Sequence, residues 1–312
     1  MGLIFILCHL TSGMIWVLDG NMPPINSYRA LRRLNTSEVA KPQDKLDFMS
    51  YLAESYEHFM VPSLFAPWAT YLVQRANPQL GEHVLDIACG TGIVARKVAP
   101  RVGISGSVVG LDANSDMIEM ARLLAEREHT AIEWHTGIAE RLPFPDEHYD
   151  LILCQFGLMF FTDKHAALQE MYRVLNKDGS IVLSVWQGLD RHPFYQTLHD
   201  VSQKHFGKSS VEAIFSLGNT DKLHKLLTDS GFRQVAIEPM SLMAHFPQPE
   251  EFLAWEIDIN PAEAPALRNL DKEAQQAIMT AARQDMQSPL EEIMQENQVV
   301  LPFHAHIAQA RK

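Results

Sequence analysis

The chain has 312 residues, of which 46% are hydrophobic and 21% charged, which is typical of a folded globular protein with one large domain or two modest ones. Its formal net charge of −12 argues against a nucleic-acid partner, because phosphate binding needs clustered Lys and Arg. Three cysteines without a Cys-x-x-Cys pair argue against disulfides or a zinc site and favour a reducing, cytoplasmic environment.

Residues 1–45 show no clear hydrophobic period, and we predict that they form an N-terminal extension. Its apolar runs GLIFILCHL and MIWVL are separated by polar residues, and each is shorter than the ~20 apolar residues of a membrane span. No basic segment precedes the first run, as it would in a signal peptide. These features favour a packed or loosely ordered extension over stable membrane insertion or targeting. An upstream start codon adding non-native residues would look the same.

Residues 46–76 are predicted to be helical, with breaks at Pro62 and Pro67. The segment is rich in aromatic side chains. These rings allow two interpretations, which are ordinary packing on a core and a cap over a ligand pocket. The aromatic residues are Tyr51, Tyr56, Phe59, Phe65, Trp68 and Tyr71.

From residue 83 onward, apolar strands alternate with amphipathic helices. The predicted strands are HVLDIA, GSVVGLD, AIEWHTG, YDLILCQFG and SIVLSVW. The helix NSDMIEMARLLAERE has an N-cap at Asn114 or Ser115. This alternation predicts a parallel sheet with helices on both faces, in which ligands bind outside the carboxyl ends of the strands.

The pattern weakens beyond residue 187. A helix over TDKLHKLLTDSGF is predicted to end at Gly231, and FRQVAIEPM and VVLPFHAHIAQARK are predicted strands. The intervening segment is mostly helical and acidic, and we predict an insertion near the mouth of the pocket. The predicted organisation is an extension over 1–45, a core with N-terminal cap helices over 46–248, the insertion over 249–297 and the last strand over 298–312.

The stretch HVLDIACGTG runs from a strand into a turn that contains Gly90 and Gly92. Glycine tolerates positive φ and lets a ligand approach the backbone. The continuation GTGIVA also fits a relaxed dinucleotide fingerprint with Ala95 at its third position. Asp112 ends the second strand and suits a ribose diol, because a carboxylate accepts from both hydroxyls. NAD and S-adenosylmethionine (SAM) both carry this ribose, so Asp112 does not separate them.

Asp86 does separate the two ligands. It ends the first strand directly beneath the glycine turn, where its negative charge would repel a pyrophosphate. SAM carries no phosphate and has two cationic groups, an ammonium and a sulfonium. The charge of Asp86 therefore favours SAM over NAD, whereas an aspartate that merely caps a turn is the structural alternative.

Four segments, taken together, resemble the class I SAM-dependent methyltransferases. They are VLDIACGTG, VVGLDANSDMIEMAR, LPFPDEHYDLILCQFGLMFF and EMYRVLNKDGSIVLSVW. The resemblance is strongest to the small-molecule branch that includes the ubiquinone and menaquinone C-methyltransferases, and it is clear over about residues 50–190. It implies an α/β fold with a Rossmann-like, mostly parallel seven-stranded sheet. It also implies SAM as cofactor and a small organic molecule as methyl acceptor at carbon, oxygen or nitrogen.

The resemblance also implies which residues bind the cofactor. With Asp86, the backbone of residues 88–90 would hold the methionine part, and Asp112 would hold the ribose. Gln155 and Phe156 would lie near the sulfonium and the acceptor. The implied cofactor-binding residues are Asp86, Ala88, Cys89, Gly90, Gly92, Asp112, Ala113, Met117, Ile138, Ala139, Gln155 and Phe156.

The chain departs from the family pattern on the adenine side. Ala113 and Met117 would flank the adenine, but the usual Gly-Asp-Ala after the third strand reads Gly137, Ile138 and Ala139. Ile138 cannot accept a hydrogen bond from the adenine amino group, although the Ala139 N–H can still reach a ring nitrogen. One contact of about 1 kcal/mol is therefore missing. The first glycine of the loop is also replaced, by Ala88.

Methyl transfer from a sulfonium needs alignment and exclusion of water, and it needs a base only if the acceptor must lose a proton. We assign no catalytic residue. The candidate bases are Tyr56, His58, His165, His192 and His304. No metal is expected, because neither paired histidines with supporting carboxylates nor clustered cysteines occur.

The aromatic cap, together with Met240 and Met243, suits an apolar or aromatic acceptor, although core packing explains them equally well. Two alternatives to a methyltransferase stay open at this point. One is an NAD(P)-dependent oxidoreductase that uses GTGIVA, and the other is a catalytically silent domain that binds SAM. The oligomeric state is not predicted.

Overall fold

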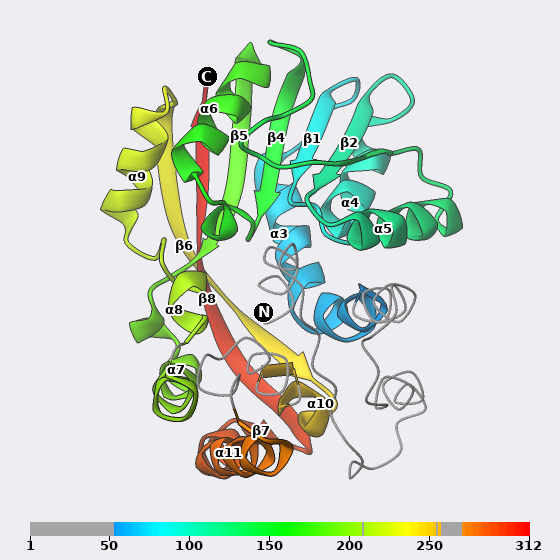
Figure 1. The fold of residues 1–312 in the computed structure, drawn as a ribbon. Helices are drawn as coiled ribbons and strands as arrows, with labels where there is room; N and C mark the ends of the chain where they lie inside the picture. The colour runs from blue at the N-terminus through cyan, green and yellow to red at the C-terminus, as the bar shows by residue number, and fades with distance from the viewer. Residues whose placement is uncertain (1–52, 208, 254, 257–269) are drawn as a thin grey trace.

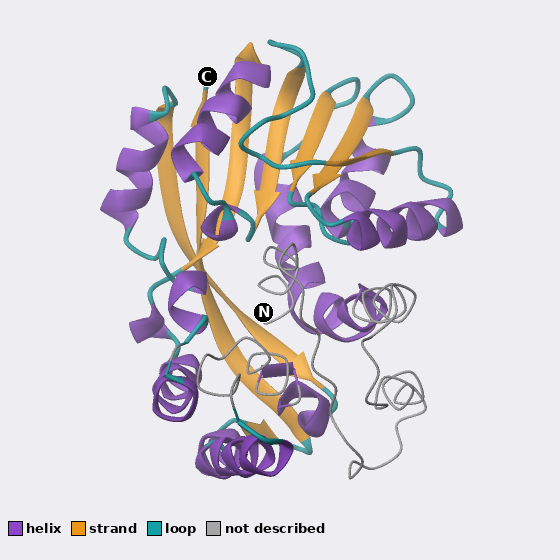
Figure 2. Cartoon of the chain, in the orientation of Figure 1, coloured by secondary structure: helices purple, strands orange, loops and turns teal. Residues whose placement is uncertain are grey.

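A computed structural model describes residues 53–312, except residues 208, 254 and 257–269 (Figure 1). The predicted extension over residues 1–45 and the start of the helix predicted from residue 46 lie outside the described residues. The described chain forms two lobes, one built on the sheet and one built around the far ends of two long strands (Figure 2).

The described residues form one eight-stranded sheet with the order β3-β2-β1-β4-β5-β8-β6 and β7 paired to β8. The parallel strands are β1 (His83–Ile87), β2 (Ser107–Asp112), β3 (Glu133–Thr136), β4 (Tyr149–Gln155) and β5 (Leu175–Trp186). The antiparallel strands are β6 (Arg233–Phe246), β7 (Met294–Gln295) and β8 (Gln298–Arg311). The mostly parallel Rossmann-like sheet was predicted, but the number of seven strands was wrong by one. The missed strand β7 has two residues, which is too short to show a hydrophobic period.

The strand order reverses between β1 and β4 at the centre of the sheet. The helix α4 (Ile93–Val102) leads from β1 to β2, and α6 (Lys164–Val174) leads from β4 outward to β5. Because the two connections run in opposite directions, right-handed crossovers place these helices on opposite faces of the sheet. Open α/β sheets bind ligands at such a point of reversal, outside the carboxyl ends of the strands, which here are β1 and β4.

Two predicted helix ends are confirmed. The helix α5 (Ser115–Arg127) begins after Asn114, whose Oδ1 accepts a hydrogen bond from the Asp116 N–H at 2.8 Å. Asn114 is therefore the N-cap, rather than Ser115. The helix α9 (Thr220–Asp229) is followed by Gly231 with a φ of 102°, a left-handed conformation that stops the helix.

The cap helix contains two prolines that do not interrupt it, so the predicted breaks were wrong. It consists of the π-helix η3 (Tyr56–Phe65) and the α-helix α3 (Ala66–Ala76), which follow each other directly. Pro62 lies inside η3, and Pro67 lies in the first turn of α3, where a missing backbone N–H costs little. The change from π- to α-helix falls between the two prolines.

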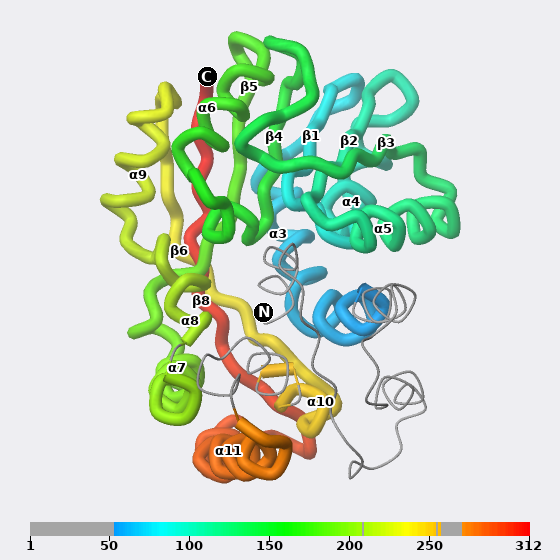
Figure 3. The backbone as a smooth tube through the Cα atoms, in the orientation of Figure 1, coloured from blue at the N-terminus to red at the C-terminus, as the bar shows by residue number. Residues whose placement is uncertain are grey.

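The second lobe is carried by the strands β6 and β8, which continue together past the end of β5 (Figure 3). Around them lie α7 (Pro193–Phe206), α8 (Val211–Ile214), α10 (Pro249–Leu253), α11 (Lys272–Asp285) and α12 (Gln287–Glu292). Asp285 on α11 accepts hydrogen bonds from Lys204 and His205 on α7, at 2.7 and 2.6 Å. The helix α7 was not predicted, and it packs with the predicted 249–297 insertion. Within the described residues, no helix is long and apolar enough to cross a membrane.

Candidate functional site

Asp86 lies at the point where the strand order reverses, and its side chain is sealed from solvent. The residue is 1% exposed, and its Oδ2 accepts a hydrogen bond from the Ala95 N–H in α4 at 3.0 Å. Its Oδ1 is buried without a hydrogen-bond partner. Burial, together with the nearby charge of Asp112, raises the pKa of the carboxyl to about 8, although the hydrogen bond from the Ala95 N–H opposes the rise. An unpartnered buried carboxylate oxygen is costly unless a donor or a cation meets it.

The turn after β1 runs through left-handed conformations at Ala88, Gly90 and Gly92, with φ values of 56°, 54° and 84°. The Gly92 N–H donates to the Cys89 carbonyl at 2.9 Å, and the Cys89 N–H donates to the Leu111 carbonyl of β2 at 3.1 Å. A side chain at Gly92 would collide with Trp134, whose ring would lie 2.3 Å from the added Cβ. The turn is therefore tied to β2 and packed against the indole of Trp134.

Asp112 links this turn to the start of α5. Its Oδ2 accepts from the Gly90 N–H and its Oδ1 from the Asn114 N–H, both at 2.9 Å. Each carboxylate oxygen keeps a lone pair for a further donor, such as a ribose hydroxyl. Burial raises the pKa of Asp112, while these backbone N–H groups oppose that rise.

The residues predicted to surround adenine differ in their exposure to solvent. Met117 and Ala139 are buried, at 2% and 3% exposure, whereas Ala113 is exposed and Ile138 is 52% exposed. An isoleucine that is half exposed makes little contribution to the core. The Nδ2 of Asn114 is buried here without a partner, and the sequence indicated only the capping role of this residue.

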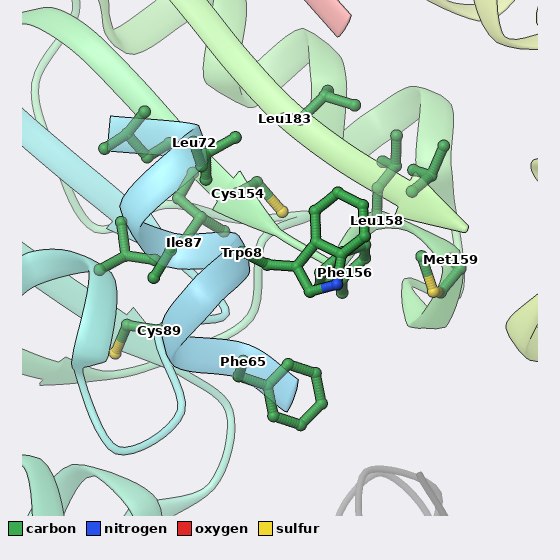
Figure 4. Close-up of a cluster of buried hydrophobic side chains, with 14 of the residues drawn as sticks. Phe65, Trp68, Leu72, Ile87, Cys89, Cys154, Phe156, Leu158, Met159 and Leu183 are labelled. Carbon is green, nitrogen blue, oxygen red and sulfur yellow. The ribbon is translucent and has the colours of Figure 1, made fainter. Parts of the chain in front are cut away.

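The carboxyl end of β4 carries an aromatic cluster (Figure 4). The ring of Phe156 stacks on Trp186 with a centroid distance of 3.6 Å and meets Trp68 edge-on at 5.5 Å. Beside it, Gln155 donates through Nε2 to the Phe65 carbonyl at 3.2 Å, and its Oε1 is buried without a partner. The Nε1 of Trp68 is also buried and unpartnered, a polar atom that the sequence did not single out.

The structure brings most of the predicted residues to one edge of the sheet, at the carboxyl ends of β1, β2 and β4. Ala113 and Ile138 are the two exposed members of this group. The assignment of the twelve residues to the cofactor stays a prediction. Asn114 and Trp68 join them here as residues with unpartnered polar atoms at the same edge.

Tyr56 covers the glycine turn, and its ring would lie 3.8 Å from a Cβ added to Gly90. Burial and the charges of Glu57, Asp112 and Asp86 raise the pKa of its phenol far above the ordinary value. Tyr56 therefore stays protonated at neutral pH, so it suits the role of a hydrogen-bond donor rather than that of a base.

Each of the four candidate histidines has a hydrogen-bond partner outside the glycine turn. His58 bonds to the Glu54 carbonyl, His165 to Ser230 and His304 to Ser241. His192 is bound through both ring nitrogens, to the Gly188 carbonyl at 3.1 Å and the His304 N–H at 3.0 Å. Burial lowers the pKa of His192 to about 4, so it is a neutral structural residue.

A hollow of about 850 Å³ lies at the opposite edge of the sheet, lined by Arg75, Asp150, Asn176 and Arg311 among others. Its polar groups pair with protein partners: Asp150 accepts from the His83 N–H and from Asn176, and Arg75 pairs with Glu238. It contains none of the predicted site residues. Within the described residues, no group of three or more His, Cys, Asp or Glu is arranged to hold a metal ion.

Comparison with known proteins gives matches in both sequence and structure. A sequence family described as "Methyltransferase domain" matches residues 84–179. The chain is 34% identical over 194 residues to the ubiquinone/menaquinone biosynthesis C-methyltransferase UbiE of Neisseria meningitidis, which covers 58% of this chain and 79% of that protein. It is 40% identical over 148 residues to UbiE of Xanthomonas campestris, covering 45% of this chain and 58% of that protein.

Two solved structures share the fold at low sequence identity. The YcgJ protein of Bacillus subtilis is 19% identical with a TM-score of 0.53, over 78% of this chain and 97% of that one. Phosphoethanolamine N-methyltransferase 2 of Haemonchus contortus, solved with S-adenosyl-L-methionine, is 18% identical with a TM-score of 0.53, over 88% of this chain and 60% of that one. At these identities the solved structures show the fold alone, and they confirm the predicted Rossmann-like arrangement.

Proposed function

Because this chain belongs to the class I SAM-dependent methyltransferases, we propose that its methyl acceptor is an apolar, ring-containing small molecule bound beside the carboxyl end of β4. The protein is an enzyme that transfers a methyl group from S-adenosylmethionine to a small organic molecule. The matches reported above favour neither of the two alternatives, the oxidoreductase and the silent domain.

We propose that SAM lies across the carboxyl ends of β1, β2 and β4. The unpartnered Oδ1 of Asp86 is the observation that carries this placement, because a buried carboxylate oxygen fits a cationic ligand and disfavours a phosphate. Three further buried polar atoms without partners, in Asn114, Gln155 and Trp68, stand around the same edge. Their donors and acceptors fit the hydroxyl, amino and carboxylate groups of SAM.

The residues of the chain align the bound cofactor and exclude water from it. Bound SAM supplies a methyl group that is already activated by the sulfonium. Asp112 holds the turn and the start of α5 in fixed positions, and Tyr56 excludes water from above the turn. The stacked rings of Phe156 and Trp186 form a weakly polar surface, which favours a reaction in which the positive charge of the sulfonium disappears.

The proposed acceptor class rests on the rings of the second lobe. Phe59 of the cap lies 5.4 Å from Phe246 and 6.3 Å from Trp255 between ring centroids, so aromatic rings from the cap and the second lobe meet there. The name of the UbiE relatives points to quinone precursors, in which a ring carbon accepts the methyl group. We propose the same kind of acceptor here, with the 249–297 insertion near the mouth of its pocket. The cysteine usage supports a cytoplasmic setting.

Calorimetric titration with SAM and with S-adenosylhomocysteine tests the cofactor placement. We expect Asp86→Asn and Asp112→Ala to weaken binding by roughly tenfold or more, the loss of a charge-assisted contact. Asp150→Asn is the matched control, because Asp150 also accepts a backbone N–H, that of His83, but lies at the opposite edge of the sheet. Unchanged affinity in both site variants contradicts the placement.

Turnover of labelled SAM with a panel of quinols, phenols and amines tests the acceptor class. Activity confined to apolar ring compounds supports the proposal, and activity confined to small charged amines contradicts it. Saturable SAM binding without turnover on any class identifies a silent domain. Saturable NAD(P)H binding in place of SAM binding identifies an oxidoreductase.

A further inference from the structure

The carboxylate of Glu57, on the cap helix, forms hydrogen bonds to the glycine turn and to α4. The side chain of Glu57, in the first turn of η3, accepts from Thr91 Oγ1 at 2.5 Å and from Arg96 Nη2 at 2.8 Å. Thr91 lies between Gly90 and Gly92 and is 1% exposed. The side chains of Arg96 and Glu57 are 6% and 13% exposed, so this is a nearly buried ion pair.

The grip of Glu57 sets the position of its neighbour over the cofactor turn. Tyr56 precedes Glu57 on η3, and its ring would lie 3.8 Å from a Cβ added to Gly90. At the other end of η3, the Phe65 carbonyl accepts from Gln155 Nε2. The cap segment is therefore attached at one end to the glycine turn and at the other end to Gln155, and the burial of its apolar side chains adds to these bonds in holding it over the turn.

The pairing of Arg96 makes this attachment reversible. Besides Glu57, Arg96 forms an ion pair with Glu128, at the end of α5. When the cap lifts, Arg96 keeps Glu128 as a partner, so opening does not leave a buried charge without compensation. Glu57 becomes accessible to water at the same time. The electrostatic part of the cost of opening is therefore smaller than the cost of breaking an isolated buried ion pair, and exposure of the apolar side chains of η3 adds to it.

We propose that Glu57 is a positioning residue that latches the cap over the bound methyl donor and sets the rate at which the demethylated product leaves. This inference rests on the proposed cofactor site. Product release in many enzymes is limited by the opening of such covering segments. The latch acts through Thr91 and Arg96 and needs no contact between Glu57 and the reacting atoms.

The test compares Glu57→Gln with Glu128→Gln. Each variant removes one carboxylate from Arg96, but only the first lies on the cap. We expect Glu57→Gln to speed S-adenosylhomocysteine dissociation by roughly tenfold or more, followed by tryptophan fluorescence in stopped flow. Hydrogen exchange within residues 56–65 should also accelerate. Glu128→Gln should change the dissociation rate by less than about twofold, because Glu128 follows α5 rather than lying on the cap and its side chain is 45% exposed.

Equal dissociation rates in the two variants overturn the latch. If Glu57→Gln folds poorly, Thr91→Val serves as the second variant, because it removes one bond to Glu57 and keeps the ion pair with Arg96. A rate for Thr91→Val equal to that of the wild type then overturns the proposal. The variant Asp112→Ala tests the proposed cofactor site separately. If that site is wrong, Asp112→Ala binds S-adenosylhomocysteine with wild-type affinity, whatever the result for Glu57→Gln.

Discussion

Ala88 and Gly157 face each other so closely that only one of them can carry a side chain. A Cβ added to Gly157 would lie 2.5 Å from the Cβ of Ala88. Ala88 belongs to the turn after β1, and Gly157 follows the end of β4. The two loops beside the proposed cofactor site are thus fitted together where the strand order reverses between β1 and β4.

We expect Gly157→Ala to destabilise the protein by about 1–3 kcal/mol, the usual effect of overpacking, and to weaken SAM binding by displacing the turn. Ala88→Gly should be nearly neutral, because relief of the left-handed conformation offsets the greater freedom of glycine in the unfolded chain. Chemical denaturation and calorimetric titration measure both effects.

The double variant Ala88→Gly with Gly157→Ala checks the cause of that loss. It should recover part of the stability, because the Cβ contact is gone while Cys154 Sγ would still lie 3.0 Å from the new methyl group. Purely additive effects of the two substitutions would show that the contact between the two residues is not responsible.

Gly92→Ala separates backbone strain from steric collision when it is compared with Gly207→Ala. Both glycines have positive φ, 84° and 69°, but a Cβ at Gly92 would collide with Trp134, whereas Gly207 has no neighbour within 4 Å. We expect Gly207→Ala to cost about 1 kcal/mol and Gly92→Ala about 1–3 kcal/mol more. Thermal unfolding measures the difference, and equal costs would mean that Trp134 yields without penalty.

The affinity for SAM should rise with pH up to about 8, because the buried Asp86 carboxyl has a pKa of about 8 in the unliganded protein. Below that pH the group holds a proton, and binding of a cation must expel it. The rise should approach tenfold per pH unit between pH 6 and 7.5, the limit for one released proton.

Asp86→Asn is the control for this pH dependence, since it keeps the acceptor for the Ala95 N–H but cannot ionise. Its affinity should follow only the titration of the ligand's own ammonium group. The same pH slope of affinity in wild type and Asp86→Asn would exclude Asp86 as the responsible group.

The raised pKa of Asp86 also implies that the unfolding free energy of the wild type falls as pH rises from about 4 to 8. In this range the folded chain binds the proton that the unfolded chain releases.

Ile138→Asp should strengthen SAM binding by about fivefold, the equivalent of one regained hydrogen bond of ~1 kcal/mol to the adenine amino group. The side chain is 52% exposed, so the substitution should leave the unfolding free energy within about 0.5 kcal/mol of the wild type. Ile104→Asp is the matched control, because Ile104 is fully exposed and the charge change is the same. Equal titration curves for the two variants would remove Ile138 from the adenine site.

The strands and helices predicted from residue 83 to residue 187 were largely right, because the signals that predict them are local. An apolar strand, a turn glycine and an N-cap each depend on a few neighbouring residues, as the confirmed cap at Asn114 shows. The prediction failed where local signals were weak, since the helix α7 was missed and β7 was too short to detect. At Pro62 the local signal was strong, but the cap helix continues through it as a π-helix.

By itself, the sequence determined the alternation of strands and helices, the glycine turn and the acids at the ends of β1 and β2. The acid at the end of β1, Asp86, also favoured SAM over NAD. These properties follow from residue type and spacing along the chain. Only the tertiary structure decided that Gly157 makes room for Ala88, that Tyr56 covers Gly90 and that Glu57 grips Thr91. Each of those contacts joins residues at least 34 positions apart in the sequence, and their meeting depends on the packing of whole elements, which no local pattern encodes.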